Sequence, residues 1–475
     1  MIARLCILWA SILALTSGCA VPGVRKEAAT FSDVPTASLH SGSGAGAHWP
    51  SSSWWQEFAD PALDHLIDEA LTGHPSIRIA QSRLLRADAI AREIGGRLYP
   101  QLSANASLAR VQPFDTAVRP PSIERPTVDA ARMTLNFSYE LDFWQRNRAA
   151  LAAALSEAVA VEAEASDARN VLATAVASTY FRLGAALSQL DIAQSGLKRR
   201  QHLFDLVQDR ERAGLDVLVS VKQAQSEAES VQADVVRTEH AVQLLRNQLA
   251  ALLGCGPERA AVLGAPLGSS YAIPELPSIV PADLLGRRPD IVASRQRVTV
   301  AAKNVHVART DFLPNVNLFA LIGLDALAPT DFFSNTNRAW SVGAAVHLPL
   351  FDGGRLNARL DARTAEYDIA VEAYNGTVLT AMREVADALT GLTKSTEALA
   401  PVSSALRSAD EAYQLTVERY RSGLVNYVAV LITENALQTR QAQSVQAREQ
   451  QLVSLAQTFK ALGGGFEVPA GSASL

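Results

Sequence analysis

Charged residues and long apolar segments are scarce in this sequence, and each scarcity excludes a class of protein. Asp, Glu, Lys and Arg make up 19% of the 475 residues and the net charge is −5, so nothing in the composition favours a nucleic-acid partner. Beyond the N-terminus there is no uninterrupted apolar run of about 18 residues, so a helical membrane span is not expected. Hydrophobic residues still make up 48% of the chain, and alanine is prominent throughout, which suits close helix packing.

Residue constellations typical of catalysis or metal binding are also missing. The 8 histidines are scattered and form no His-Glu-x-x-His or Cys-His spacing. No nucleophile, base and orienting group stand out as a set. We therefore expect no catalytic residue, no metal site and no cofactor, which argues against an enzyme of the cell envelope.

The first residues have the pattern of an export signal. Arg4 supplies a positive start, and an apolar stretch of signal-peptide length follows. The sequence Leu15-Thr16-Ser17-Gly18-Cys19 then resembles the bacterial lipobox, where a signal peptidase cuts before a lipid-modified cysteine. Ala20 rather than Asp follows, which favours sorting to the outer membrane. We predict a signal peptide over residues 1–18 and lipidation of Cys19; an ordinary signal peptide with an incidental cysteine is the alternative.

The 3 cysteines then leave no intrachain disulfide in the mature protein. Cys6 is removed with the signal and Cys19 is acylated, so Cys255 stands alone. A single acyl chain binds a membrane only weakly, so a second membrane-binding device is expected. Residues 19–53 are predicted to be an extended linker that carries the lipid anchor.

The rest of the chain reads as an internal duplication. Pro75 corresponds to Pro289 and Pro100 to Pro314, each at an offset of 214 residues. Further on, Arg212-Ala213-Gly214-Leu215 matches Arg421-Ser422-Gly423-Leu424 at an offset of 209. Chance similarity of alanine-rich helices does not place two prolines and two glycine turns in one order. We predict repeats over 54–270 and 271–465, followed by a tail over 466–475.

Each repeat contains two short segments in which apolar and polar residues alternate. The predicted strands cover residues 101–110, 132–142, 315–325 and 340–350. Strict alternation over about 10 residues is typical of a transmembrane β-barrel, and a soluble sandwich with an apolar inner face is the alternative. The polar faces supply the candidates for the barrel lumen, which are Asn136, Ser138, Glu140, Asn317 and His347.

Each strand pair is followed by a stretch that predicts a very long helix. Residues 145–213 contain no proline, and residues 355–422 contain only Pro401. About 65 helical residues reach roughly 100 Å, far beyond a globular helix, and call for a coiled coil or a helical barrel. Each helix then turns at a glycine and returns, so we predict two long antiparallel hairpins.

Four strands in one chain cannot close a barrel. An open edge in lipid leaves unpaired backbone groups that each cost several kcal/mol, so copies of the chain must share a barrel. Two copies give a barrel that side chains fill, whereas three give twelve strands and a lumen. Counting alone permits three or four copies.

The order of five motifs resembles the TolC family of outer membrane factors, in its NodT-like lipoprotein branch. The motifs are Trp54 to Leu63, Glu140 to Arg148, Leu284 to Ile291, Leu348 to Arg355 and Arg419 to Leu424. Each motif alone is weak, and the ordered set covers nearly the whole mature chain. The resemblance implies a mainly α protein with a small transmembrane β part. It implies a homotrimer in which a 12-stranded barrel continues into a long α-helical barrel.

The same resemblance implies a function and partners. Such proteins are passive exit ducts for small molecules such as drugs, located in the Gram-negative outer membrane and extending into the periplasm. A periplasmic adaptor docks at the closed tip and links the duct to an inner-membrane pump of the resistance-nodulation-division or major-facilitator type. A conduit for protein secretion or metal efflux remains an alternative within the family, and a secreted coiled-coil scaffold remains one outside it.

The resemblance also directs attention to the hairpin turns, where family members close the tip with charged and polar residues. The candidates are Arg212, Gly214, Asp216, Ser220, Arg419, Tyr420, Arg421, Gly423, Asn426 and Tyr427. Family members often carry Asp at the positions of Ser220 and Val425, so Asp216 is the expected source of negative charge. We hypothesise that Arg419 or Arg421 pairs with an acidic group across the hairpin. For any single residue, simple solvation of a helix turn is an equal alternative.

Overall fold

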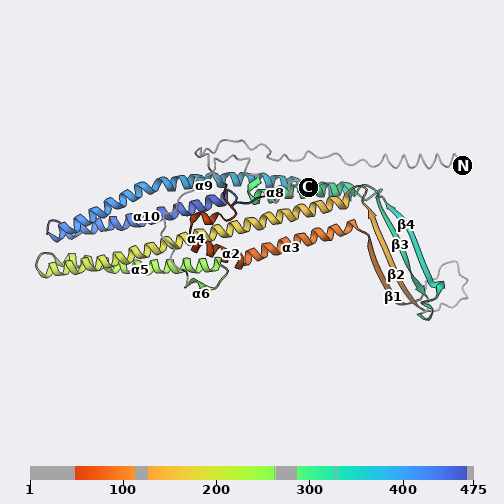
Figure 1. Ribbon diagram of the computed structural model, residues 1–475, viewed down its shortest axis with the longest axis horizontal. Coiled ribbons are helices and arrows are strands. Elements are labelled where there is room, and N and C mark those ends of the chain that lie inside the picture. The colour runs from red at the N-terminus through yellow and green to blue at the C-terminus, as the bar shows by residue number, and fades with distance from the viewer. Residues whose placement is uncertain (1–48, 113–126, 262, 264–285, 327–328, 468–475) are drawn as a thin grey trace.

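The computed structural model describes residues 49–112, 127–261, 263, 286–326 and 329–467. Four predicted features lie wholly or mainly outside these ranges: the signal peptide, Cys19, the linker over 19–53 and the C-terminal tail. Within them the molecule is long and narrow, with helical hairpins at one end and a four-stranded sheet at the other (Figure 1).

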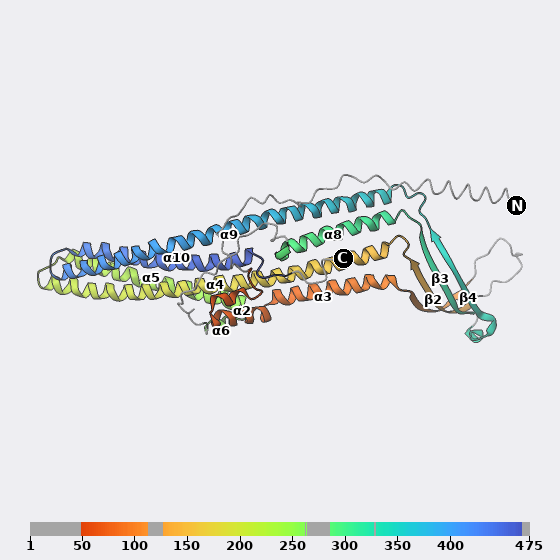
Figure 2. The same ribbon diagram turned by 45° about the horizontal axis from the view of Figure 1, so that its top comes forward.

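The two predicted hairpins are present and have equal arm lengths. The first consists of α4 (Arg146–Arg212) and α5 (Leu218–Leu252), and the second of α9 (Arg355–Arg421) and α10 (Tyr427–Ala461). The outgoing arms have 67 residues each and the returning arms 35 each. Helix α9 continues through Pro401, as predicted. Both hairpins point away from the sheet, so their turns form one tip of the molecule (Figures 1 and 2).

The two hairpin turns have the same backbone geometry. Gly214 and Gly423 have φ values of 74° and 76°, in the left-handed region that a side chain disfavours. The residue that follows each glycine donates its backbone N–H to a carbonyl in the last turn of the preceding helix. Leu215 donates to the carbonyl of Arg210 at 2.8 Å, and Leu424 donates to the carbonyl of Arg419 at 2.9 Å. This is the Schellman arrangement, which satisfies the last carbonyls of each long helix.

The segment between the N-terminal motif and the first strand contains two helices. It consists of α2 (Pro61–Gly73) and α3 (Pro75–Gly95), with a short 3-10 turn, η2 (Gly96–Leu98), at the end. His74 lies between the two helices in an extended conformation, with φ −71° and ψ 133°. A residue before proline is pushed out of the helical region, so Pro75 ends the first helix and starts the second.

The other helices of the described chain are shorter. They are η1 (Trp54–Phe58) and the four-residue α6 (Pro257–Ala260) near the middle, α8 (Pro289–Thr310), which leads from the middle to the sheet (Figure 2), and the 3-10 turns η3 (Pro329–Asp331) and η4 (Asn335–Asn337) between the last two strands. Trp54 stacks against Phe459 near the end of α10, with ring centroids 5.3 Å apart, and Phe58 packs on Phe181 of α4 at 4.9 Å. The N-terminal motif therefore contributes to the main apolar core of the helical part.

One helix contains a segment apolar enough to cross a membrane by length and composition. This helix is α4, and 56% of the segment is buried inside the molecule. Helix α4 contacts α2, α3, α5, α8 and α10, which accounts for its apolar composition.

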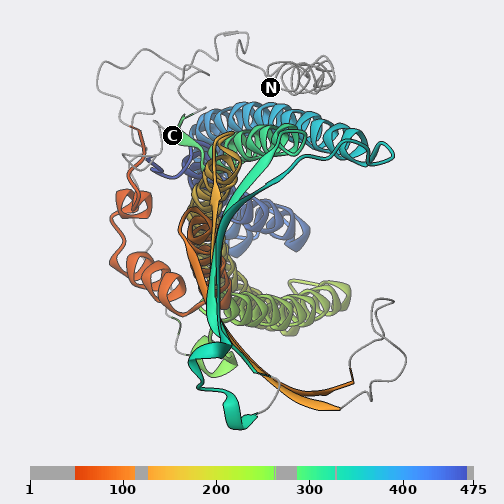
Figure 3. The same cartoon turned by 90° about the vertical axis from the view of Figure 1, so that its right-hand side faces the viewer.

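The sheet contains four antiparallel strands in the order β1-β2-β3-β4. Their bounds are β1 (Gln101–Val111), β2 (Val128–Leu141), β3 (Asn315–Ala326) and β4 (Arg338–His347). The predicted ranges were close for β1 and β3, but β2 begins four residues earlier than expected. Strand β4 ends three residues before the predicted end because Pro349 cannot donate a ladder hydrogen bond. Seen along the molecule, the strands follow a curved arc (Figure 3).

The register of the sheet separates an apolar face from a polar one. Leu135 pairs with Ile322, and Ile322 pairs with Trp340, so these side chains share one face. Trp340 is 74% exposed, and no element of the described chain covers this face of the sheet. A soluble sandwich would bury it, so that alternative was wrong.

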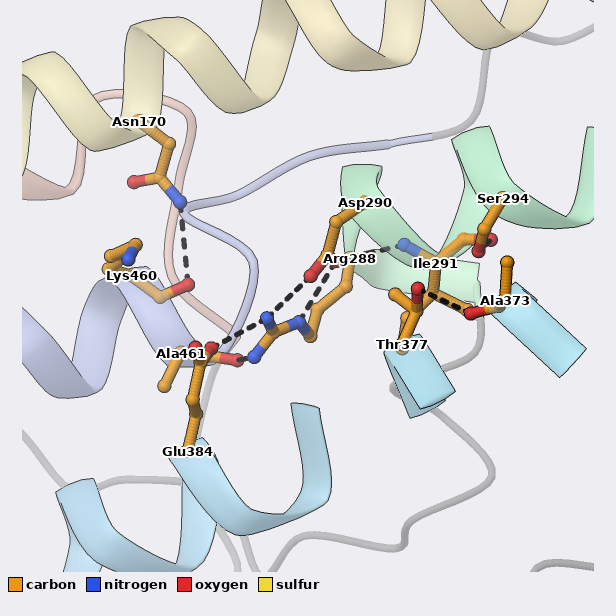
Figure 4. A network of polar contacts seen from close by, with 10 residues as sticks. All are labelled: Asn170, Arg288, Asp290, Ile291, Ser294, Ala373, Thr377, Glu384, Lys460 and Ala461. Atoms are coloured by element: carbon orange, nitrogen blue, oxygen red, sulfur yellow. Dashed lines mark hydrogen bonds and ion pairs between the residues drawn. The ribbon is translucent and has the colours of Figure 1, made fainter. Parts of the chain in front are cut away.

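A buried arginine joins three helices near the middle of the molecule (Figure 4). Arg288, just before α8, donates to both carboxylate oxygens of Asp290, to Glu384 of α9 at 2.8 Å and to the carbonyl of Ala461 at the end of α10 at 3.1 Å. Asp167 of α4 lies beside this group, and burial is the main reason that its pKa is raised. The Arg288 network therefore ties the end of the second hairpin to the helix that leads to the sheet.

Loss of the Arg288 guanidinium is expected to destabilise the protein. Arg288→Met leaves Asp290, Glu384 and a helix-end carbonyl without their common donor, and we expect a cost of about 2–3 kcal/mol. Arg383→Met is the matched control, because Arg383 pairs with Asp387 on the exposed surface of α9 and its loss costs about 0.5 kcal/mol or less. Thermal unfolding followed by circular dichroism in detergent measures both; equal shifts would contradict the role of Arg288.

Candidate functional site

The tip of the molecule brings the two hairpins together through three polar side chains. The hydroxyl of Tyr420 in α9 donates to Oδ2 of Asp216 at 2.9 Å. Arg210 of α4 reaches the same group, with Nε 3.9 Å from Asp216 Oδ2 and Nη1 donating to the carbonyl of Tyr420 at 3.4 Å. The guanidinium carbon also lies 4.8 Å from the centre of the Tyr420 ring. We call Arg210, Asp216 and Tyr420 the tip contact.

Local structure places each member of the tip contact. Asp216 lies in the turn after Gly214, immediately before α5, and its Oδ1 accepts from the backbone N–H of Val217 at 2.9 Å. Tyr420 lies in the last turn of α9, where its side chain is fully buried. Arg210 lies in the last turn of α4. The tip contact thus joins residues that the two glycine turns bring to the same end.

The electrostatics of the tip contact favour a charged carboxylate and a neutral phenol. Burial alone would raise the pKa of Asp216, but hydrogen bonds from Val217, Ser220 and Tyr420 together with the charge of Arg210 lower it. The pKa of Tyr420 is raised, mainly by burial and then by its hydrogen bond to Asp216. At neutral pH the phenol therefore donates to a charged acceptor, which is the stronger kind of hydrogen bond.

Several sequence candidates lie at the tip without joining the tip contact. Arg212 binds Gln208 and Asp209 on its own helix. Asn426 caps α10 by accepting from the N–H of Ala429 at 3.2 Å. Tyr427 is buried with its ring 6.3 Å from that of Tyr420.

Arg419 and Arg421 are exposed in the last turn of α9. Within the described part of one chain, neither forms an ion pair. The guanidinium that reaches across the hairpins is instead that of Arg210, a residue that the sequence analysis missed.

Two further charged residues were missed and could have been found from their spacing. Arg200 lies three residues before Leu203, and Val207 follows four residues after Leu203. Glu434 lies four residues after Val430 and three residues before Leu437. This is the spacing of core positions in packed helices, where a charge is unusual. Both residues are buried in the structure.

The predicted lumen residues come together on the polar face of the sheet. Register pairs Glu140 with Asn317 and Asn315 with His347, and Asn136 and Ser138 lie on the same side of β2 as Glu140. Asn315 donates to Oε1 of Glu140 at 2.9 Å. A single polar face therefore runs along the four strands, opposite the exposed apolar face.

This architecture matches known proteins along nearly its whole length. The sequence matches the family described as "Outer membrane efflux protein" over residues 66–255 and again over residues 280–464. Outer membrane protein OprJ of Pseudomonas aeruginosa is 31% identical, over 96% of this chain and 95% of OprJ. Fusaric acid resistance protein FusA of Burkholderia cepacia is 38% identical over 67% of this chain, which spans 61% of the length of FusA.

Solved structures show the same fold. The outer membrane protein VceC of Vibrio cholerae has a TM-score of 0.81 at 37% identity, covering 88% of this chain and all of the VceC chain. The MtrE outer membrane channel of Neisseria gonorrhoeae, solved in its open state, has a TM-score of 0.80 at 26% identity, covering 94% and 98% of the two chains. Among these relatives, MtrE is named as a channel. The predicted resemblance is confirmed, and the chain belongs to the outer membrane efflux protein family.

Proposed function

We propose that three copies of this outer membrane efflux channel build one exit duct, with a shared 12-stranded barrel in the outer membrane and a helical tunnel across the periplasm. This proposal rests on two properties of the sheet, its uncovered apolar face and its open edges. Its apolar face is uncovered, and β1 and β4 each have only one neighbouring strand in the described chain. Pairing β1 of one copy with β4 of the next removes both open edges, and three copies leave room for a lumen.

The helices next to the sheet support the same assembly. In α3 only Ile77 and Ala91 are buried, while Ile79 and Leu85 are exposed. On α9, at the other side of the subunit, Ile369 is also exposed. A helix that buries so little on its own subunit gains stability by packing on another, so α3 of one copy is proposed to meet α9 of the next.

Cysteine pairs at the two sheet edges test this assembly. With Cys255→Ser as background, Ala106→Cys in β1 is combined in turn with Val342→Cys, Ala344→Cys and Val346→Cys in β4. All four positions lie on the apolar face. We expect oxidation of native membranes to give covalent dimers and trimers for at least one pair.

The control places both cysteines on central strands that pair within one chain. Leu135→Cys with Ile322→Cys joins direct register partners of β2 and β3, so only monomers are expected. Intermolecular bands that are absent for every edge pair, or that extend to a tetramer, would contradict the trimer.

We further propose that the tip contact holds the periplasmic end of the duct closed. It joins the last turn of the first long helix to the last turn of the second, so separation of the hairpins must break it. A hydrogen bond to a charged group contributes about 1.5–3 kcal/mol, which is roughly a ten- to hundredfold change in the ratio of closed to open tips.

Removing the tip hydrogen bond is therefore expected to raise channel conductance in planar bilayers. Tyr420→Phe deletes the hydroxyl but keeps the ring beside Arg210, and Asp216→Asn removes the charge. Arg212→Gln is the control, because Arg212 binds only its own helix in the described chain. Since the pKa of Asp216 is lowered, the wild-type contact should persist at neutral pH and weaken only as pH falls through that lowered value. Unchanged conductance in both tip variants would contradict this gate.

Arg419 and Arg421 remain candidates for contacts with a neighbouring copy at the tip. Both are exposed beside the Gly423 turn, where three subunits would converge. Arg419→Ala and Arg421→Ala belong in the same bilayer assay, and the hypothesis fails if neither changes the conductance.

The proposed cargo is a small organic molecule, and the proposed partners are an adaptor and an inner-membrane pump. Relatives of this chain are named for fusaric acid resistance, pyoverdine export and toluene efflux, which supports small molecules over secreted proteins. Exposed Leu215, Val217, Leu218 and Leu424 at the tip offer apolar surface to a periplasmic adaptor. A pump of the resistance-nodulation-division or major-facilitator type would supply the energy.

The lipid anchor and the duplication are proposed on separate grounds. The lipobox ending at Cys19 supports an acyl anchor, and loss of labelled palmitate in a Cys19→Ser variant would test it. The equal lengths of the paired helices and the two successive matches to one family support repeats over 54–270 and 271–465.

A further inference from the structure

The two hairpins meet along α4 and α10 through a mainly apolar interface. Near the tip all four long helices contribute to a cluster of buried side chains, Leu203, Val207, Val221, Ala224, Tyr413, Tyr420, Tyr427, Val430 and Leu437. Apolar side chains at helical spacing attract without direction, so they do not by themselves decide which turn of one helix faces which turn of the other. A slip by one helical turn moves α10 by about 5.4 Å along α4.

The tip contact depends on the axial position of the hairpins. Its hydrogen bond is 2.9 Å long and joins side chains on different hairpins. A slip of about one turn, 5.4 Å, would carry Tyr420 away from Asp216 even if the apolar cluster stayed buried. Polar groups elsewhere in the interface can therefore support the tip contact by favouring one register.

A fully buried ion pair lies within this interface, above the tip. Nε of Arg200 on α4 is 3.1 Å from Oε2 of Glu434 on α10, and the side chains are 1% and 0% exposed. Arg200 Nη2 also donates to Oδ1 of Asn435 at 2.6 Å. Arg199 lies 3.6 Å from the other oxygen of Glu434, and Glu227 of α5 lies 4.0 Å from Arg200.

Such a pair is costly to bury, which makes a role in plain stability a weak explanation. Desolvation of two charges can exceed their attraction, and apolar residues of similar size are often as stable in such positions. Burial raises the pKa of Glu434 despite two neighbouring arginines, which shows how strongly the site disfavours charge. A buried polar group in a helical interface does, however, penalise every alternative register in which it loses its partner.

A close contact one turn away marks the observed register. Gly196 of α4 is buried, and a Cβ built there would lie 2.5 Å from the amide nitrogen of Gln438, the flexible end of a side chain on α10. Gly196 is four residues before Arg200, and Gln438 is four residues after Glu434. Because the Gln438 side chain can move aside, this contact reports the register and does not set it.

We propose that Arg200 and Glu434 are positioning residues that set the axial register of the two hairpins and so place Tyr420 opposite Asp216. The inference deepens the proposed gate, and it rests on that proposal only for its effect on conductance. A slip by one turn carries Glu434 away from both Arg199 and Arg200, and it leaves Arg200 with only Glu227 of its own hairpin at 4.0 Å. The apolar cluster supplies attraction, and the ion pair selects one of its possible alignments.

Disulfide trapping measures the register directly. In a Cys255→Ser background, Gly196→Cys with Gln438→Cys reports the observed register, and Gly196→Cys with Ala442→Cys reports a slip by one turn. With Arg200 and Glu434 intact, we expect the first pair to crosslink faster. In the double variant Arg200→Met, Glu434→Met, the preference for the first pair should fall by roughly tenfold, equivalent to about 1.4 kcal/mol.

Two further variants separate register from general stability. The conservative variant Arg200→Lys keeps a cation opposite Glu434 and beside Glu227, and it should retain the preference for the first pair. The double variant Arg182→Met, Glu449→Met is the matched control, because it removes another ion pair between α4 and α10 whose side chains are 48% and 27% exposed. We expect no change of register in this control.

The outcomes are distinct. A crosslinking preference that survives Arg200→Met, Glu434→Met overturns the proposal, as does a shift that Arg200→Lys shows equally or that the control pair reproduces. A shift confined to the double Met variant, with raised bilayer conductance, supports both the register role and the gate. The same shift with unchanged conductance supports the register role while refuting the gate at Tyr420 and Asp216.

Discussion

A helix of 67 residues has no globular core that can enclose it, so it must find a packing partner on every turn. Helix α4 meets this constraint largely with small residues, and alanines at 149, 153, 160, 173 and 177 are among its buried positions. Small side chains let neighbouring helices approach closely, and α3, α5, α8 and α10 all contact α4. The alanine-rich composition is thus a consequence of the length of the helices.

Close packing of small residues leaves the alignment of neighbouring helices weakly specified. Polar side chains that need particular partners join the helices at three places. Arg288 joins α8, α9 and the end of α10 in the middle of the molecule. Arg200 and Glu434 join α4 and α10 between that point and the tip. Asp216 and Tyr420 join the hairpins at the tip itself. Three polar connections therefore follow one another along a mainly apolar bundle.

Position along the molecule also separates the tasks of an outer membrane efflux channel. The sheet has one apolar and one polar face, which is the pattern that the proposed barrel needs with lipid outside and water inside. The hairpin turns, where Tyr420 meets Asp216, lie at the end of the molecule opposite the sheet (Figure 1).

The sequence by itself determined the long helices, the alternating strands and the glycine turns, because these depend on local periodicity and backbone preference. It also identified Asp216 and Tyr420 as tip residues through family resemblance. Only the tertiary structure decided that Arg210 joins them, that Arg200 meets Glu434 and that Arg288 binds Glu384. Side chains that meet in these contacts are far apart in the sequence. Tyr420 lies 204 residues from Asp216, and Arg200 lies 235 residues from Asn435, the residue after Glu434. Their meeting depends on how four helices align, which no local pattern encodes.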